Sequence, residues 1–275
     1  MKKYEDHIDI VIPAVLSKDG QKDGIKNDDY VKLLMDSVDK YTEYPYKVYI
    51  IPETRHKEEE QSLEELREYF NNRKNSEKCL DIQVIPSMNT SKELNDVDDK
   101  YTEVDNRMVG VSSFNKSLAH QTGIKAGNGK YVCILDYDCA VLNEWTQHMI
   151  PLSEEYFFVS AMWRNDIKIA RDQFLFYKRS KFDEVDLIPD CTVADTSGNI
   201  TRYAEDNNLE FYICINSSIY SNPSLRKYHV LDIEDGEQIY INSKPFLHHF
   251  RKGSAREENT KSKWREEVIK YLETH

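Results

Sequence analysis

Cysteine is scarce in this sequence, and no long apolar run is present. The five cysteines are odd in number and scattered without a CxxC pair, which argues against a disulfide framework and a zinc ribbon and favours a reducing compartment. No segment approaches the ~18 apolar residues of a membrane-spanning helix. Glu5, Asp6 and Asp9 interrupt the short apolar stretch at the N-terminus, which is untypical of a signal peptide. We therefore expect a cytoplasmic protein without a transmembrane segment.

Positive charge is also in short supply. The chain carries 37 Lys and Arg against 49 Asp and Glu, a formal net charge of −12. Such a surface repels nucleic acid and anionic membranes, so we expect no nucleic-acid partner, whereas a small basic pocket for a phosphate is still compatible with it. Hydrophobic residues make up 39% and charged residues 31%, enough for an apolar core beneath a charged surface.

Short apolar runs alternate with amphipathic stretches through the first part of the chain. The runs at 8–13, 47–53 and 82–85 predict strands, and the periodic stretches at 28–40 and 58–69 predict helices. Strands and helices in alternation are typical of an α/β layer with a mainly parallel sheet.

The second part of the chain continues this pattern. Ser112 or Ser113 can cap a helix that stops at the Gly127 turn, and the apolar run 131–135 then predicts a strand covered on both faces. In a C-terminal helix, Trp264 and Val268 share one face, which predicts packing on the core. We also expect an acidic surface loop at 91–106, strands at 155–162, 173–180 and 209–215, and a helix from Asp195 to about Asn207.

Two aspartates, Asp136 and Asp138, directly follow the predicted strand at 131–135. In open α/β sheets ligands bind beyond the carboxyl ends of the strands. Carboxylate oxygens together with substrate phosphates are the ligands that Mg²⁺ and Mn²⁺ prefer. The triplet alone is weak, because Asp-x-Asp also occurs as a polar turn in acidic proteins.

The surroundings of this triplet carry a family resemblance. Residues 115–138, NKSLAHQTGIKAGNGKYVCILDYD, resemble the segment of inverting GT-A glycosyltransferases of the family 2 type in which a helix, a short turn and an apolar strand precede Asp-x-Asp. Gly123 and the Gly127 turn are in register with that segment, whereas Gln121 replaces the family's usual Asn. The resemblance implies a GT-A (Rossmann-like) α/β fold, with a mainly parallel central sheet, helices on both faces and a C-terminal helical extension.

The resemblance also implies a division of the chain and a donor site. It implies a glycosyltransferase domain over 1–255, with a nucleotide-binding half at 1–140 and an acceptor-binding half at 141–255, followed by a helix at 256–275. Pro13 ends a run similar to the family's first strand. Glu53 stands where the family commonly has a nucleobase-binding Asp, and a Glu can accept the same hydrogen bond; a solvated strand-end carboxylate is the alternative. Gln121 and Asp136 complete the expected nucleotide contacts.

Downstream residues supply the expected base. Asp195, just before a predicted helix, is similar in position to the family's catalytic carboxylate, which removes the proton of the acceptor hydroxyl. The alternative role for Asp195 is a helix N-cap. Asp172 is a reserve candidate for the base, and Asp190 is a weaker one. Trp163 lies where the family contacts acceptors, although most aromatic residues of the chain are expected in the core.

The pair His248 and His249 is followed by Arg251 and Lys252 in a Gly/Ser-containing segment. Many GT-A enzymes take a further metal ligand from a C-terminal histidine, so the resemblance implies that one of this pair joins Asp138 on the metal. An imidazole suits Mn²⁺ better than Mg²⁺. Arg251 is then expected to meet the donor diphosphate.

The resemblance thus implies a metal-dependent glycosyltransferase that takes a sugar from a nucleotide-diphosphate sugar to a glycan or another hydroxyl-bearing acceptor. Mn²⁺, or Mg²⁺, is the expected metal. Two alternatives stay open: a non-catalytic carbohydrate-binding or scaffolding protein on the same fold, and a sugar nucleotidyltransferase. The second normally has a Gly-rich basic loop after the first strand, and the segment AVLSKDGQKDG is a poor phosphate cradle.

Overall fold

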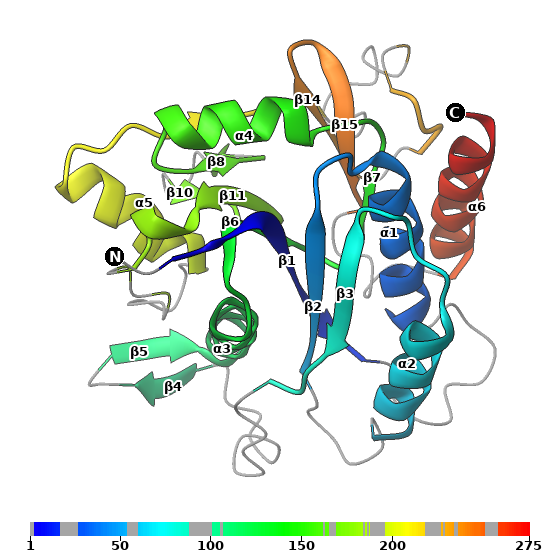
Figure 1. Ribbon diagram of the computed structural model, residues 1–275, viewed down its shortest axis with the longest axis horizontal. Helices are drawn as coiled ribbons and strands as arrows, with labels where there is room; N and C mark the ends of the chain where they lie inside the picture. Colours follow the sequence, from blue (N-terminus) through cyan, green and yellow to red (C-terminus); the bar gives the residue numbers. More distant parts are fainter. Residues whose placement is uncertain are drawn as a thin grey trace.

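The centre of the protein is a seven-stranded sheet (Figure 1). The computed structural model describes residues 3–16, 27–53, 60–87, 101–104, 107–161, 163–164, 169–183, 185, 187, 196–217, 227, 229–233, 236–250 and 258–275. In spatial order the strands are β12 (Tyr212–Ile213), β8 (Val159–Ser160), β11 (Phe174–Lys178), β6 (Gly129–Leu135), β1 (Glu5–Val15), β2 (Tyr46–Glu53) and β3 (Cys79–Val84). Among these seven strands β11 alone runs antiparallel to its neighbours. The predicted α/β class with a mainly parallel sheet is therefore confirmed.

Helices cover both faces of this sheet, as expected (Figure 1). One face packs against α1 (Asn27–Tyr41), α2 (Glu60–Asn72) and α4 (Thr146–Glu155), and the other against α3 (Val111–Ala126) and α5 (Thr196–Asp206). Successive side chains of a strand point to opposite faces. Ile10 and Ile12 of β1 therefore join the first core, whereas Val11 joins the second. This explains why β1 and β6 are apolar without alternation.

A smaller antiparallel sheet lies beside the carboxyl end of β6. Its spatial order is β13 (Ile215–Ser217), β14 (Glu237–Ile241), β15 (Lys244–His249) and β7 (Cys139–Val141). The final helix α6 (Glu258–Thr274) packs Trp264 and Val268 against Tyr30 and Leu33 of α1, so the predicted packing of this helix on the core is confirmed. The other elements are β4 (Tyr101–Val104), β5 (Arg107–Gly110), β9 (Trp163–Arg164), β10 (Ile169–Ala170) and the 3₁₀ helix η3 (Arg179–Lys181). Of the described helices, none has the length and apolar character to cross a membrane.

Three predicted elements are corrected by the structure. The expected strand at 155–162 is reduced to β8, because Glu155 still belongs to α4 and the rings of Phe157 and Phe158 are buried by stacking on other aromatic rings outside any strand. The expected strand at 209–215 is divided between β12 and β13, which belong to different sheets. Within the expected loop at 91–106, residues 101–104 form β4, and 91–100 lie outside the described residues.

The hairpin between β14 and β15 turns at Asn242 and Ser243. Both residues have positive φ, 48° and 63°, as a two-residue type I′ turn requires. Glycine adopts such angles without the steric cost that a Cβ brings. We expect Ser243→Gly to raise the free energy of unfolding by roughly 0.5–1 kcal/mol, measured by urea denaturation. Asn242→Gly is the companion variant, with a smaller gain because Asn tolerates this region; a loss of stability in Ser243→Gly would contradict the turn assignment.

Candidate metal centre

Asp136 and Asp138 lie at the carboxyl end of β6, in a tight turn into β7. The backbone N–H of Cys139 donates to the Asp136 carbonyl at 3.2 Å, and that of Phe250 donates to the Asp138 carbonyl at 2.9 Å. The second bond ties the turn to the end of β15, so segments more than one hundred residues apart in sequence meet at Asp138. The Asp138 side chain is buried, at 9% exposure. The backbone of both aspartates is thus fixed by hydrogen bonds.

The two histidines lie on a strand, β15, and not in the Gly/Ser loop that the sequence suggested. Neighbouring residues of a strand point to opposite sides. His249 faces the acidic turn, with Nε2 3.5 Å from Asp138 Oδ1. His248 faces α6, where its Nδ1 accepts a hydrogen bond from Trp264 Nε1 at 3.1 Å. The structure therefore brings His249, and not His248, to the two aspartates.

Asp136, Asp138 and His249 form a group that fits a divalent cation. Each offers one ligand atom, and these atoms all lie within 4.8 Å of one another. Two carboxylates and one imidazole suit Mn²⁺ better than Mg²⁺ or Ca²⁺, which prefer oxygen ligands alone. The chemistry of this donor set, together with its burial, makes the end of β6 a candidate metal centre.

Burial and charge shift the pKa values of the same groups. Burial, reinforced by the nearby charges of Asp172 and Asp138, raises the pKa of Asp136 to about 6 although Lys116 opposes it. For His249, burial lowers the pKa, but the charge and hydrogen bonding of Asp138 and Glu237 outweigh burial and bring it to about 9. His249 is therefore protonated at neutral pH without a cation, and a cation that takes its nitrogen must displace a proton.

Lys116 and Asp172 join this site; the sequence offered Asp172 only as a reserve base and did not indicate Lys116. Lys116 Nζ, from α3, lies 2.9 Å from Asp136 Oδ1 and 3.0 Å from Asp172 Oδ1. Asp172 precedes β11 and its side chain is fully buried. Burial raises the pKa of Asp172, but Lys116 and other positive groups outweigh burial and leave it below its ordinary value. One lysine therefore bridges two buried carboxylates.

His120 lies one helical turn after Lys116 and is also fully buried. Burial lowers the pKa of its imidazole to about 3, so the ring is neutral. Neither ring nitrogen has a hydrogen-bond partner among the described residues. The sequence held one signal that these two side chains share a face: Lys116 and His120 are four residues apart in a predicted helix.

Replacing Lys116 tests its competition with a cation for Asp136. We expect Lys116→Gln to bind Mn²⁺ roughly 10-fold more tightly, because one positive charge next to a ligand is lost. The measurement is free Mn²⁺ by electron paramagnetic resonance at pH 8, well above the pKa of about 6 that Asp136 has in the native chain. Lys125→Gln, an exposed change on the same helix, is the control and should leave affinity unaltered. Equal affinity of Lys116→Gln and the native chain would contradict the idea.

Several expected site residues lie elsewhere or outside the described part of the chain. Pro13 is buried within β1, next to Ile51 of β2, and Glu53 ends β2 while its side chain is outside the described residues. The structure likewise does not describe Asp195, Asp190, Arg251, Lys252 and the side chain of Trp163.

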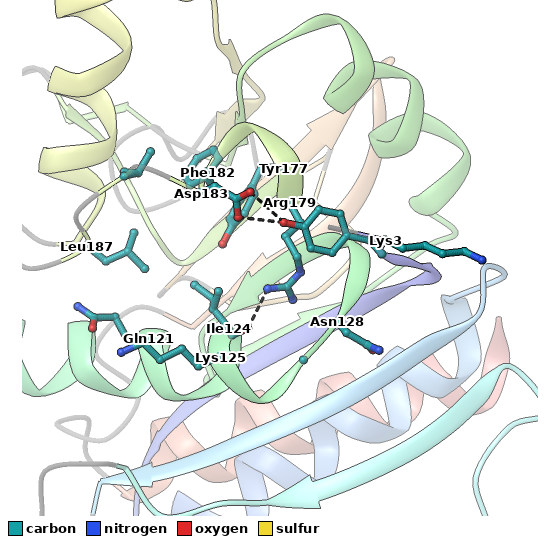
Figure 2. Close-up of a pocket in the computed structure, with 13 residues that line it drawn as sticks. Lys3, Gln121, Ile124, Lys125, Asn128, Tyr177, Arg179, Phe182, Asp183 and Leu187 are labelled. Carbon is teal, nitrogen blue, oxygen red and sulfur yellow. Dashed lines mark hydrogen bonds between the residues drawn. The ribbon is translucent and has the colours of Figure 1, made fainter. Parts of the chain in front are cut away.

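Gln121 lies at a cavity of about 740 Å³, away from the candidate metal centre (Figure 2). This cavity adjoins Lys3 and Asn128, next to the amino ends of β1 and β6, whereas the two aspartates follow the carboxyl end of β6. Figure 2 shows Gln121 and Lys125 on one wall, with Leu187 opposite. The structure thus separates Gln121 from Asp136 and Asp138.

Comparison with known proteins gives a fold likeness alone. No protein-family model matches the chain, and no curated protein matches it. Among solved structures, S. aureus TarS has a TM-score of 0.46 at 12% identity, over 75% of this chain and 35% of that one. TarS 1–349 has a TM-score of 0.45 at 13% identity, and its complex with UDP 0.44 at 12%, each over 75% of this chain and 57% of that one. The chain thus spans about a third to just over half of these proteins, and TM-scores under 0.5 establish no shared activity.

Proposed function

We propose that this protein is a metal-dependent glycosyltransferase with a GT-A fold, which transfers a sugar from a nucleotide-diphosphate sugar to an acceptor hydroxyl. The observation that carries the proposal is the convergence of Asp136, Asp138 and His249 at the carboxyl end of a buried strand. In open α/β sheets this edge is where nucleotides and their phosphates bind. The resemblance of residues 115–138 to family 2 supports the same assignment.

In this proposal Asp138 and His249 would hold the cation, and Asp136, in the same group of candidate ligands, would orient the nucleotide sugar. When bound, a Mn²⁺ ion supplies positive charge that the donor diphosphate needs as it leaves. Arg251 directly follows Phe250 in the sequence, and the N–H of Phe250 donates to the Asp138 carbonyl, so we propose that Arg251 meets the donor diphosphate. Pro13 and Glu53 are proposed nucleotide contacts on the family resemblance, whereas Gln121, which lies at the cavity near the amino ends of β1 and β6, is no longer proposed as one.

The transfer is proposed to be a single displacement with inversion. The acceptor oxygen forms a bond to the anomeric carbon while the bond to the nucleoside diphosphate breaks, and a base accepts the hydroxyl proton. Asp195 is the proposed base. Asp172 fits that role less well, because its side chain is fully buried and Lys116 keeps its pKa below the range of an efficient base.

The two histidines provide a matched test of the proposed ligand set. We expect His249→Gln to weaken Mn²⁺ binding roughly 10- to 100-fold, because an imidazole that suits Mn²⁺ is lost. His248→Gln, one residue away on the other side of β15, should leave affinity unchanged, since Gln can still accept the bond from Trp264. Calorimetric titration with Mn²⁺ compares them, and equal losses in both variants would contradict the assignment.

The function itself is tested by calorimetry with UDP, with and without Mn²⁺, followed by a screen of nucleotide sugars for Mn²⁺-dependent hydrolysis or transfer. UDP is the first probe because one structural neighbour was crystallised with it. Metal-dependent nucleotide binding with sugar release supports the proposal. Glycan binding without nucleotide binding would instead indicate a non-catalytic carbohydrate-binding protein. Release of pyrophosphate from a nucleoside triphosphate and a sugar phosphate would indicate a nucleotidyltransferase.

A further inference from the structure

A second carboxylate lies on the far side of the His249 ring. Glu237 of β14 is the direct cross-strand partner of His249 on β15, and such partners place their side chains on the same face of a sheet. Glu237 Oε2 lies 3.5 Å from His249 Nδ1, within ion-pair distance. On the other side Nε2 lies 3.5 Å from Asp138 Oδ1. The imidazole therefore lies between two carboxylates, each within ion-pair distance of one ring nitrogen.

This arrangement distinguishes the two ring nitrogens. A carboxylate beside Nδ1 favours the tautomer with a proton on Nδ1, which leaves the lone pair of Nε2 for a metal. Nε2 is the nitrogen that faces Asp138. We propose that Glu237 is a positioning residue, which fixes the tautomer and the orientation of His249 so that Nε2 is presented to a divalent cation at Asp136 and Asp138. The inference rests on the metal site of the proposed function.

The other histidine of this hairpin, His248, has no carboxylate opposite it on β14. The neighbouring cross-strand pair, Gln238 and His248, faces the other way and carries no charge near its imidazole from β14; the His248 ring is held instead by Trp264. A buried carboxylate costs several kcal/mol unless it is compensated, yet Glu237 is only 7% exposed. Its position is set by register, because a slip of one residue would place Gln238 opposite His249.

The experiment measures Mn²⁺ and Mg²⁺ affinity in the full chain, with free Mn²⁺ followed by electron paramagnetic resonance and Mg²⁺ by competition. We expect Glu237→Gln to bind Mn²⁺ roughly 10- to 100-fold more weakly. Mg²⁺ affinity should fall less, because Mg²⁺ draws little on an imidazole. Glu237→Asp, which keeps the charge, should recover part of the loss. Gln238→Met, an equally buried change on the opposite side of β14, should leave both affinities unaltered.

Each outcome separates this inference from the function on which it rests. If the native chain binds no Mn²⁺, the metal site itself is wrong. If the native chain binds Mn²⁺ and Glu237→Gln binds it equally well, Glu237 does not position His249. Equal losses of Mn²⁺ and Mg²⁺ affinity, shared by Gln238→Met, would show that the hairpin has merely loosened, which also overturns the inference. Should Glu237→Gln fail to fold, Glu237→Asp decides, because an unchanged ratio of the two affinities contradicts the positioning role.

Discussion

Asp138→Asn should lower sugar transfer about 1000-fold at subsaturating Mn²⁺, with little effect on stability. A cation that neutralises the leaving diphosphate contributes several kcal/mol to the transition state, and each 1.36 kcal/mol is a factor of about ten in rate. Asn keeps the size of the side chain and loses the charge. Asp138 has a like charge, Asp136, two residues away and an opposite charge, the His249 ring, at 3.5 Å. Asp138→Asn relieves the repulsion and loses the attraction, and the two effects oppose each other, so the variant should unfold at a urea concentration close to that of the native chain.

The combination of lost activity and retained stability is the diagnostic result. Transfer is measured with the best nucleotide sugar from the screen, over a range of Mn²⁺ concentrations, beside urea denaturation of the same protein. Asp183→Asn is the matched control: Asp183 accepts a hydrogen bond from Tyr4 at 2.9 Å, near the amino end of β1, and lies outside the candidate ligand group. Full activity of Asp138→Asn would show that the metal is held elsewhere.

Local pattern was sufficient to predict the main layers of the fold. The apolar run of β6 and the amphipathic stretch of α1 were recognised because burial on both faces of a strand, or on one face of a helix, leaves a periodic trace in sequence. Short strands leave a weaker trace, and β8 and β12 have two residues each. Helix α4 was missed because Pro151 lies inside it, and proline usually argues against a helix interior.

The candidate site was only half accessible from sequence, for a physical reason. Asp136 and Asp138 belong to one local motif, whereas Lys116, Asp172 and Glu237 reach the site from α3, the approach to β11, and β14. Contacts of this kind depend on how the strands pair and in which register. The local pattern of a single sequence does not reveal either. The same applies to the histidines: without the pairing of β15 with β7 and β14, nothing distinguished His248 from His249.

Arg179 stabilises the opposite end of the sheet, where it joins the ends of several segments. Its Nη2 donates to buried Asp9 of β1, Nε donates to the Gly129 carbonyl at 2.7 Å, and Nη1 donates to the Ile124 carbonyl at 2.8 Å. Asp9 also accepts from the Gly129 N–H at 2.6 Å. A Cβ on Gly127 would approach Asp9 Oδ2 to 2.2 Å, so the turn before β6 has room only for glycine. The guanidinium thus neutralises Asp9 and closes the end of α3 against β1 and β6.

Arg179→Met should therefore lower the free energy of unfolding by about 3–5 kcal/mol, because the buried Asp9 carboxylate loses the guanidinium and keeps only the His7 ring and the Gly129 N–H beside it. Whole domains are stable by only about 5–15 kcal/mol, so the loss is a large part of the total. Lys178→Met is the matched control one residue earlier: Lys178 bonds Glu154 at 2.6 Å on the surface, and such pairs contribute about 1 kcal/mol or less. Urea denaturation compares the two.

Adding Asp9→Asn to Arg179→Met should restore part of the stability, since residue 9 then carries no charge. Equal small losses in Arg179→Met and Lys178→Met would show that the charge of Asp9 is compensated without Arg179.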